Sequence, residues 1–176
     1  MKLYITTFLL LTLKVYGQAP LDIKFYLDNS QISKTAKDFY NGKFKVADNT
    51  KTFSIIDSLK TKNNTIRPFY IFLISKIIDK ADGALSESLG ISCKEFIESK
   101  PDFLIGFLYS QNKIVDKRFP DNWAKQIAGE FMIDCEGKEK QCIKKSLQQA
   151  TKKSKSYNKS RLIEFYKKVE SYCSSS

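Results

Sequence analysis

The chain is predicted to fold as an all-α domain of about seven short helices, and three observations support this class. Apolar residues recur at spacings of three and four over much of residues 18–176. Polar capping residues or prolines precede several of these stretches, as is typical of helix starts. The dipeptides Asp82-Gly83 and Asn41-Gly42 follow helical patterns rather than joining two alternating runs, so they do not indicate β-hairpins.

Residues 1–17 are predicted to be a cleaved export signal rather than a helix of the fold. Lys2 precedes an apolar run from Leu3 to Val15, which is the pattern of a secretory signal. The alternative, a buried N-terminal helix, is disfavoured because no polar face repeats through this run. A cut after Gly17 leaves residues 18–176 as a single domain, exported to the periplasm or the extracellular space. No later run approaches the roughly 20 apolar residues of a transmembrane helix.

Two short helices are predicted after an ambiguous start. Residues 20–29 alternate between apolar and charged side chains, which fits an extended arm as well as a helix. The first helix is expected over residues 30–41, with Asn29 or Ser30 as its N-cap. The second is expected over residues 50–60.

The central helix of the fold is predicted over residues 65–81. Its apolar residues occupy most of its faces, which is typical of a helix surrounded by others. Pro68 falls in the first turn, where the missing N–H has no helical partner, and Gly83 is predicted to end the helix. A further helix is expected over residues 84–99, with a break near Gly90 because glycine is costly inside a helix.

Four more helices complete the predicted fold. They are a short one over residues 103–109, one that begins after Pro120, a lysine-rich one over 138–153 and a last one that reaches Cys173. Trp123 is in helical register with other apolar residues and is predicted to be a core residue rather than an anchor for a partner. The helices form either a compact bundle or a short irregular α-solenoid, since no repeat of fixed period decides between them.

The four cysteines predict two disulfides, because an exported protein encounters an oxidising compartment. Three pairings are possible. We favour Cys135 with Cys142, because residues 136–141 read as a polar turn between two helices, and Cys93 then pairs with Cys173 by elimination. A zinc site is disfavoured because the chain has no histidine and no closely spaced cysteine pair, so no metal ligand or cofactor is assigned.

The absence of histidine removes the most common catalytic arrangements. Ser–His and Cys–His catalysis both need an imidazole, and the single, scattered glycines form no phosphate-binding loop. Carboxylate pairs remain, at Glu130 with Asp134 and at Glu95 with Glu98. Such pairs occur on most solvated helices, so a carboxylate-based hydrolase is the weakest alternative and no catalytic residue is assigned.

Positive charge is concentrated in the C-terminal third of the chain. Residues 138–168 contain 11 Lys or Arg and only Glu139 and Glu164 as acids, whereas the rest of residues 18–176 holds 17 of each sign. Such a field attracts an anionic surface or an acidic envelope or secreted protein, while export takes the chain away from nucleic acid. The alternative is an ordinary solvated surface. The candidate contact residues are Lys140, Lys144, Lys145, Lys152, Lys153, Lys155 and Lys159.

These features together predict an exported, non-enzymatic helical binding protein. A carrier of a small hydrophobic ligand is the main alternative, because the chain contains 13 Phe and 9 Tyr. Those rings either fill a core or line a ligand cavity, and both arrangements have the same helical periodicity.

Overall fold

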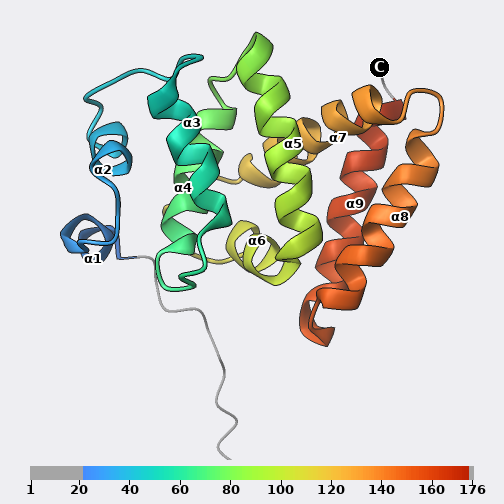
Figure 1. Ribbon diagram of the computed structural model, residues 1–176. Coiled ribbons are helices and arrows are strands. Elements are labelled where there is room, and N and C mark those ends of the chain that lie inside the picture. The colour runs from blue at the N-terminus through green and yellow to red at the C-terminus, as the bar shows by residue number, and fades with distance from the viewer. Residues whose placement is uncertain (1–21, 175–176) are drawn as a thin grey trace, which may run out of the picture.

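The computed structural model describes residues 22–174, and within that range all the regular structure is helical (Figure 1). This confirms the predicted all-α class. The predicted export signal, residues 1–17, lies outside the described residues. The elements are α1 (Ile23–Asp28), α2 (Lys34–Tyr40), α3 (Thr50–Asp57), η1 (Ser58–Lys60), α4 (Arg67–Ile78), α5 (Gly83–Ser99), α6 (Pro101–Leu108), α7 (Phe119–Asp134), α8 (Glu139–Lys153), η2 (Ser156–Asn158) and α9 (Lys159–Ser174).

The N-terminal boundaries differ from the predicted ones because different residues cap the helices. Asp22 accepts a hydrogen bond from the backbone N–H of Lys24 at 2.9 Å, so the ambiguous segment starts as helix α1 and not as an extended arm. Ser33 caps α2 by accepting from the N–H of Ala36 at 3.1 Å. The prediction of Asn29 or Ser30 as this cap is therefore wrong, since Asn29 follows the last residue of α1 instead.

Two glycines act differently from the predictions. Helix α4 already ends at Ile78, and Gly83, with φ of +45°, is the first residue of α5. Helix α5 then continues through Gly90 without the expected break. A Cβ atom at Gly90 would lie 3.0 Å from Oε2 of Glu130 on α7. The missing side chain therefore allows α5 and α7 to approach closely, which offsets the cost of glycine within a helix.

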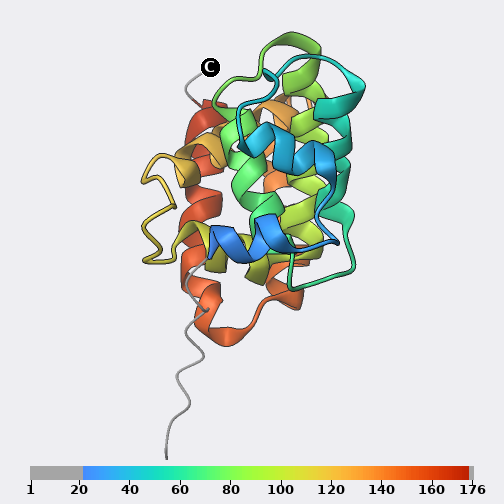
Figure 2. The ribbon, with the colours of Figure 1, turned by 90° about the vertical axis from the view of Figure 1, so that its left-hand side faces the viewer.

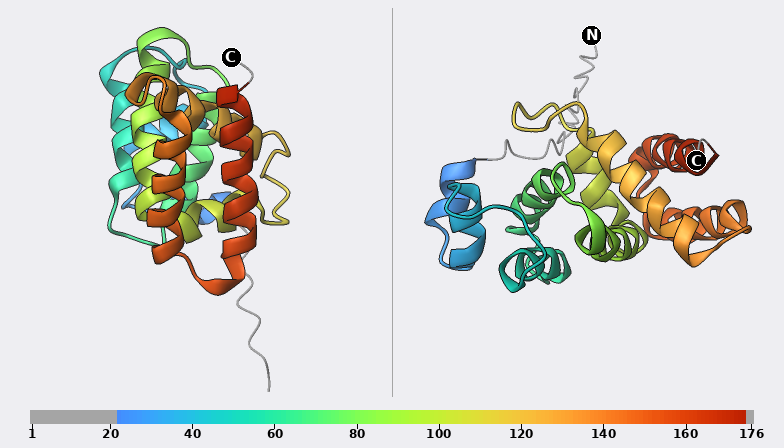
Figure 3. Two further views of the ribbon diagram at one scale, coloured as in Figure 1. Left: turned by 90° about the vertical axis from the view of Figure 1, so that its right-hand side faces the viewer. Right: turned by 90° about the horizontal axis from the view of Figure 1, so that it is seen from above.

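The helices form a row, and α7 lies across part of it. Seen from above, the row runs from α1 and α2 at one end to the α8–α9 hairpin at the other (Figure 3). Helices α3, α4, α5, α8 and α9 are roughly upright, as Figure 2 also shows from the N-terminal side, whereas α7 runs at a steep angle to them. Helix α7 contacts α4, α5, α8 and α9. A regular solenoid of stacked hairpins has no such crossing helix, so an irregular bundle describes the arrangement better.

Trp123 on α7 belongs to the hydrophobic core. Its exposed fraction is 0%, which confirms the predicted core position. The indole Nε1–H donates a hydrogen bond to Oγ of Ser75 on α4 at 2.8 Å, and the ring lies 6.3 Å from that of Phe96 on α5. One buried polar contact thus joins α4 to α7 within a largely apolar interior.

Replacing Ser75 by Ala should destabilise the protein by roughly 1–3 kcal/mol, because the buried indole N–H of Trp123 would lose its acceptor. Urea denaturation, followed by the fluorescence of this single tryptophan, measures the change. Ser54→Ala is the matched control, since Ser54 is exposed and its hydroxyl bonds only to a carbonyl of its own helix. Equal stability losses in the two variants would show that the hydrogen bond from Trp123 to Ser75 contributes no more to stability than the exposed one of Ser54.

Candidate functional site

The seven candidate lysines are all exposed, and they lie on α8 and in the connection from α8 to α9. We call this set the lysine-rich surface: Lys140, Lys144, Lys145, Lys152, Lys153, Lys155 and Lys159. The opposite face of α8 is buried through Ile143, Ser146 and Ala150. Helix α8 therefore presents its polar face to solvent, as its sequence pattern predicts.

Asp102 on α6 holds the α8–α9 connection in place. Its carboxylate accepts hydrogen bonds from the hydroxyl of Ser154 at 3.0 Å, the backbone N–H of Lys155 at 3.1 Å and the amide of Asn158 at 2.9 Å. Within the hairpin, the hydroxyls of Ser146 and Tyr166 are hydrogen-bonded at 2.7 Å. These contacts give the lysines of the connection a defined backbone, because a carboxylate that accepts several bonds fixes the chain around it.

The lysine-rich surface keeps its charge uncompensated. None of the ion pairs among residues 22–174 includes one of its seven lysines. Lys153 instead donates to the backbone carbonyl of Glu98 at 2.9 Å, and the ammonium of Lys155 lies 6.0 Å from the ring centroid of Tyr157. The positive field of this surface is therefore directed into solvent.

Two large hydrophobic side chains are exposed next to these lysines. Tyr157, in the connection, is 67% exposed, and Ile163, one turn along α9 from Lys159, is 43% exposed. Exposed apolar side chains beside cations are typical of surfaces that lie in the interfacial region of a bilayer. Neither Tyr157 nor Ile163 is among the contact residues predicted from the sequence.

The carboxylate pair of Glu130 and Asp134 lies between α5 and α7. Glu130 is 5% exposed, and desolvation, reinforced by the nearby Asp134 charge, raises its pKa to about 7. Asp134 pairs with Lys94 at 2.8 Å, and this bond lowers the pKa of Asp134. Neither carboxylate lines the cleft that contains Phe96 or the cleft that contains Tyr172. Burial against Gly90 accounts for the raised pKa of Glu130.

The aromatic residues mainly fill the core. Two of the clefts on the described surface are each lined by a single aromatic side chain, Phe96 in one and Tyr172 in the other. The Tyr172 cleft, of about 660 Å³, lies among α4, α5, α7 and α9 and has polar walls that include Asn122 and Gln126. Neither of these two clefts is therefore the aromatic-lined cavity that a carrier of a hydrophobic ligand needs.

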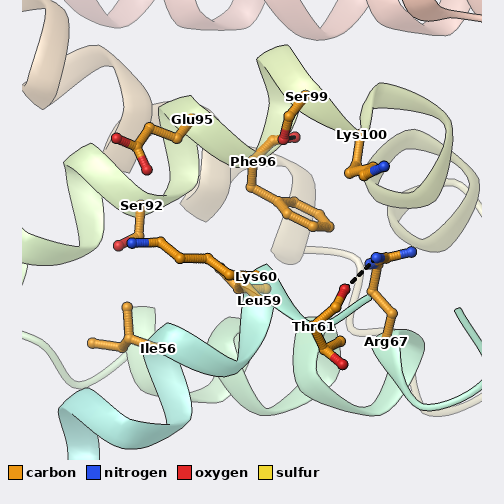
Figure 4. A pocket seen from close by; sticks show the side chains of 10 residues that line it. All are labelled: Ile56, Leu59, Lys60, Thr61, Arg67, Ser92, Glu95, Phe96, Ser99 and Lys100. Atoms are coloured by element: carbon orange, nitrogen blue, oxygen red, sulfur yellow. Dashed lines mark hydrogen bonds between the residues drawn. The ribbon is translucent and has the colours of Figure 1, made fainter. Parts of the chain in front are cut away.

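Arg67 is a buried cation that is not among the site residues predicted from the sequence. It is 2% exposed at the start of α4, and it lines the cleft that contains Phe96 (Figure 4). The feature of the sequence that could have indicated Arg67 is its position directly before Pro68, in the first turn of a helix that is apolar on most of its faces. A buried arginine needs hydrogen-bond or charged partners, because the transfer of a charge out of water is costly.

The cysteines follow one of the two predicted pairings. Cys135 and Cys142 form a disulfide across the turn between α7 and α8, the pairing that the sequence favoured. Cys93 and Cys173 are free thiols, so the second bridge predicted by elimination is wrong. Cys93 is buried in α5, whereas the Sγ–H of Cys173 on α9 donates to the carbonyl of Ala128 on α7 at 3.6 Å. Elimination failed because it takes no account of which helix faces meet.

Among residues 22–174, none of the helices has the length and hydrophobicity needed to cross a bilayer. The same residues contain no cluster of three or more acidic or cysteine side chains arranged to hold a metal ion.

Comparison with known proteins finds no matching family model, no similar curated protein and no similar solved structure.

The number of free thiols in the chain can be measured with a thiol reagent. Unfolded without reductant, the chain should react with two equivalents of a thiol reagent, from Cys93 and Cys173. The folded protein should react slowly at neutral pH, because burial raises the pKa of both thiols. Zero equivalents would show that Cys93 and Cys173 are bridged after all, and four equivalents would show that Cys135 and Cys142 are not bridged. The Cys135→Ser/Cys142→Ser variant should keep the count at two and lose roughly 2–3 kcal/mol of stability through the opened loop.

Glu130 should make stability depend on pH. Its pKa rises from 4.5 when unfolded to about 7 in the folded protein, so the folded state binds more protons between these values. The free energy of unfolding should therefore fall as pH rises through this window, by at most roughly 3 kcal/mol. Glu130→Gln should abolish this fall.

Urea denaturation at pH 5 and pH 8 measures the effect of Glu130. The exposed Glu136→Gln variant is the control and should retain the wild-type pH dependence. If Glu130→Gln and wild type lose the same stability between the two pH values, Glu130 is not the titrating group.

Proposed function

We propose that this chain is an exported, non-enzymatic binding protein that docks on an anionic lipid surface through the lysine-rich surface. The observation that carries the proposal is the set of seven exposed lysines without carboxylate partners among residues 22–174. Export is supported by the apolar run after Lys2 and agrees with the Cys135–Cys142 disulfide.

A lipid surface fits the chemistry better than an acidic protein or a soluble polyanion. The lysines supply attraction to anionic headgroups, and each contributes about 1 kcal/mol near such a membrane. The exposed side chains of Tyr157 and Ile163 supply the apolar contact that a soluble polyanion would not use. Asp102 holds the connection that carries Tyr157, so the apolar and cationic groups are presented together.

Replacing Lys140, Lys144, Lys145 and Lys152 by Gln should lower binding to phosphatidylglycerol vesicles by roughly 100- to 1,000-fold, because four headgroup attractions are lost. Vesicle co-sedimentation of the mature chain measures this, with phosphatidylcholine vesicles as the uncharged reference. Rising salt should weaken wild-type binding in the same assay, since the attraction is screened. Lys153 is left intact because it bonds to the backbone of α5.

The matched control replaces Lys45, Lys80, Lys113 and Lys117 by Gln, four exposed lysines that form no ion pair among residues 22–174. Equal losses in the two variants would mean that net charge alone drives binding and that no localised surface exists. Tyr157→Ser with Ile163→Ser separates lipid from polymer. It should weaken vesicle binding and leave heparin binding unchanged, whereas unchanged vesicle binding would argue against the lipid surface.

A further inference from the structure

The cleft that contains Arg67 combines apolar walls with an uncompensated buried cation. We call it the Arg67 cleft. It lies between the α3–η1 segment and α5 and has a volume of about 240 Å³ (Figure 4). Its lining residues are Ile56, Leu59, Lys60, Thr61, Arg67, Ser92, Glu95, Phe96, Ser99 and Lys100.

Arg67 carries its charge in this cleft without an acidic partner. None of the ion pairs among residues 22–174 includes it. One Nη donates to the side chain of Asn64 and the other to the carbonyl of Thr61, while the Nε–H is buried without a hydrogen-bond acceptor. The guanidinium also lies 4.5 Å from the ring centroid of Phe103. All these partners are neutral.

The neutral partners leave both charge and donors available. A guanidinium has five N–H donors, and the two bonds to Asn64 and Thr61 leave further Nη hydrogens free. Burial lowers the pKa of Arg67, but arginine stays protonated in proteins. A desolvated cation without a counter-charge is costly, and an anion that enters the cleft relieves that cost.

The rest of the cleft is also suited to an anion. Lys60 and Lys100 are exposed lining residues and Glu95 is the single acid, so the lining with Arg67 carries a net charge of +2, although Lys60 also pairs with Asp57 at 4.0 Å. Figure 4 shows Lys100 and Thr61 at the end of the cleft where Arg67 lies, whereas Glu95 and Ser92 lie at the other end. The positive end of the cleft is therefore separated from its one carboxylate.

The walls and the size of the cleft restrict the kind of anion. Ile56, Leu59 and Phe96 supply apolar surface, which a bare inorganic anion does not use. The volume of about 240 Å³ is below the roughly 300–1,000 Å³ of pockets for drug-sized ligands. The occupant is therefore a small molecule with one charged end and a short apolar body.

We infer that the Arg67 cleft binds a small organic acid, with its carboxylate paired to Arg67 and its apolar body against Ile56, Leu59 and Phe96. A carboxylate suits this site because it accepts two parallel N–H bonds from a guanidinium. The inference does not depend on the lysine-rich surface, since the two sets share no residue.

Isothermal titration of the mature chain with hexanoate tests this inference, with hexanamide and inorganic phosphate as probes that lack the charge or the apolar body. Hexanoate should bind at least tenfold more tightly than either, because charge-assisted bonds and apolar burial add. Trp123 fluorescence gives a second readout, since its ring lies 6.3 Å from that of Phe96. Equal binding of hexanoate and hexanamide, or no binding of hexanoate at millimolar concentrations, would overturn the inference.

Variants locate the site. Arg67→Met should weaken hexanoate binding by about 10- to 100-fold, because the carboxylate loses its charged partner. Since a substitution at the buried Arg67 can impair folding, two variants at exposed lining residues, called the rim variants, also test whether the acid binds in this cleft. Lys100→Gln should weaken binding about two- to fivefold, and Glu95→Gln should strengthen it by a similar factor, as expected for screened charges.

The controls are matched by charge. Lys80→Gln and Glu136→Gln make the same two charge changes at exposed positions outside the cleft and should leave hexanoate affinity unchanged. The quadruple variant of the lysine-rich surface should also bind hexanoate normally, so that failure of the proposed docking and failure of the cleft can be told apart. If the rim variants and their controls change affinity equally, the acid binds elsewhere and the inference is wrong.

Discussion

The position of α7 across its neighbours is the constraint on which the rest of the structure depends. Helix α7 contacts α4 and α5 on one side of the row and α8 and α9 on the other. In the first half of α7 the fully buried Trp123 needs an acceptor for its indole N–H, and Ser75 on α4 supplies one. The hydrogen bond therefore specifies how α4 and α7 are placed relative to each other, which apolar packing alone does less sharply.

The same crossing explains the unusual chemistry of Glu130. Because Gly90 has no side chain, α5 and α7 approach closely enough for the Glu130 carboxyl group to be enclosed. Desolvation then raises its pKa, whereas Asp134, which pairs with Lys94, has a lowered pKa. Divergent pKa values in a carboxylate pair often mark an acid–base site. Here, burial between the helices accounts for the raised pKa of Glu130, and the bond with Lys94 accounts for the lowered pKa of Asp134.

Positive charge occurs in two different settings in this molecule. The lysine-rich surface keeps its ammonium groups in solvent, where they act collectively and are screened by salt. Arg67 is desolvated, so its single charge acts at short range and with the fixed geometry of a guanidinium. The first arrangement suits an extended anionic surface and the second a small acid, and the two are independent because they lie on different elements.

The sequence by itself determined the features that depend on local pattern. Helical periodicity predicted the all-α class, the core position of Trp123 and the exposure of the α8 lysines, and a short polar turn predicted the Cys135–Cys142 bridge. Only the tertiary structure decided that Cys93 and Cys173 stay apart, that α5 continues through Gly90 and that Arg67 is buried beside a cleft. These features depend on which helix faces meet, and such contacts join residues far apart in the chain, which no local spacing encodes.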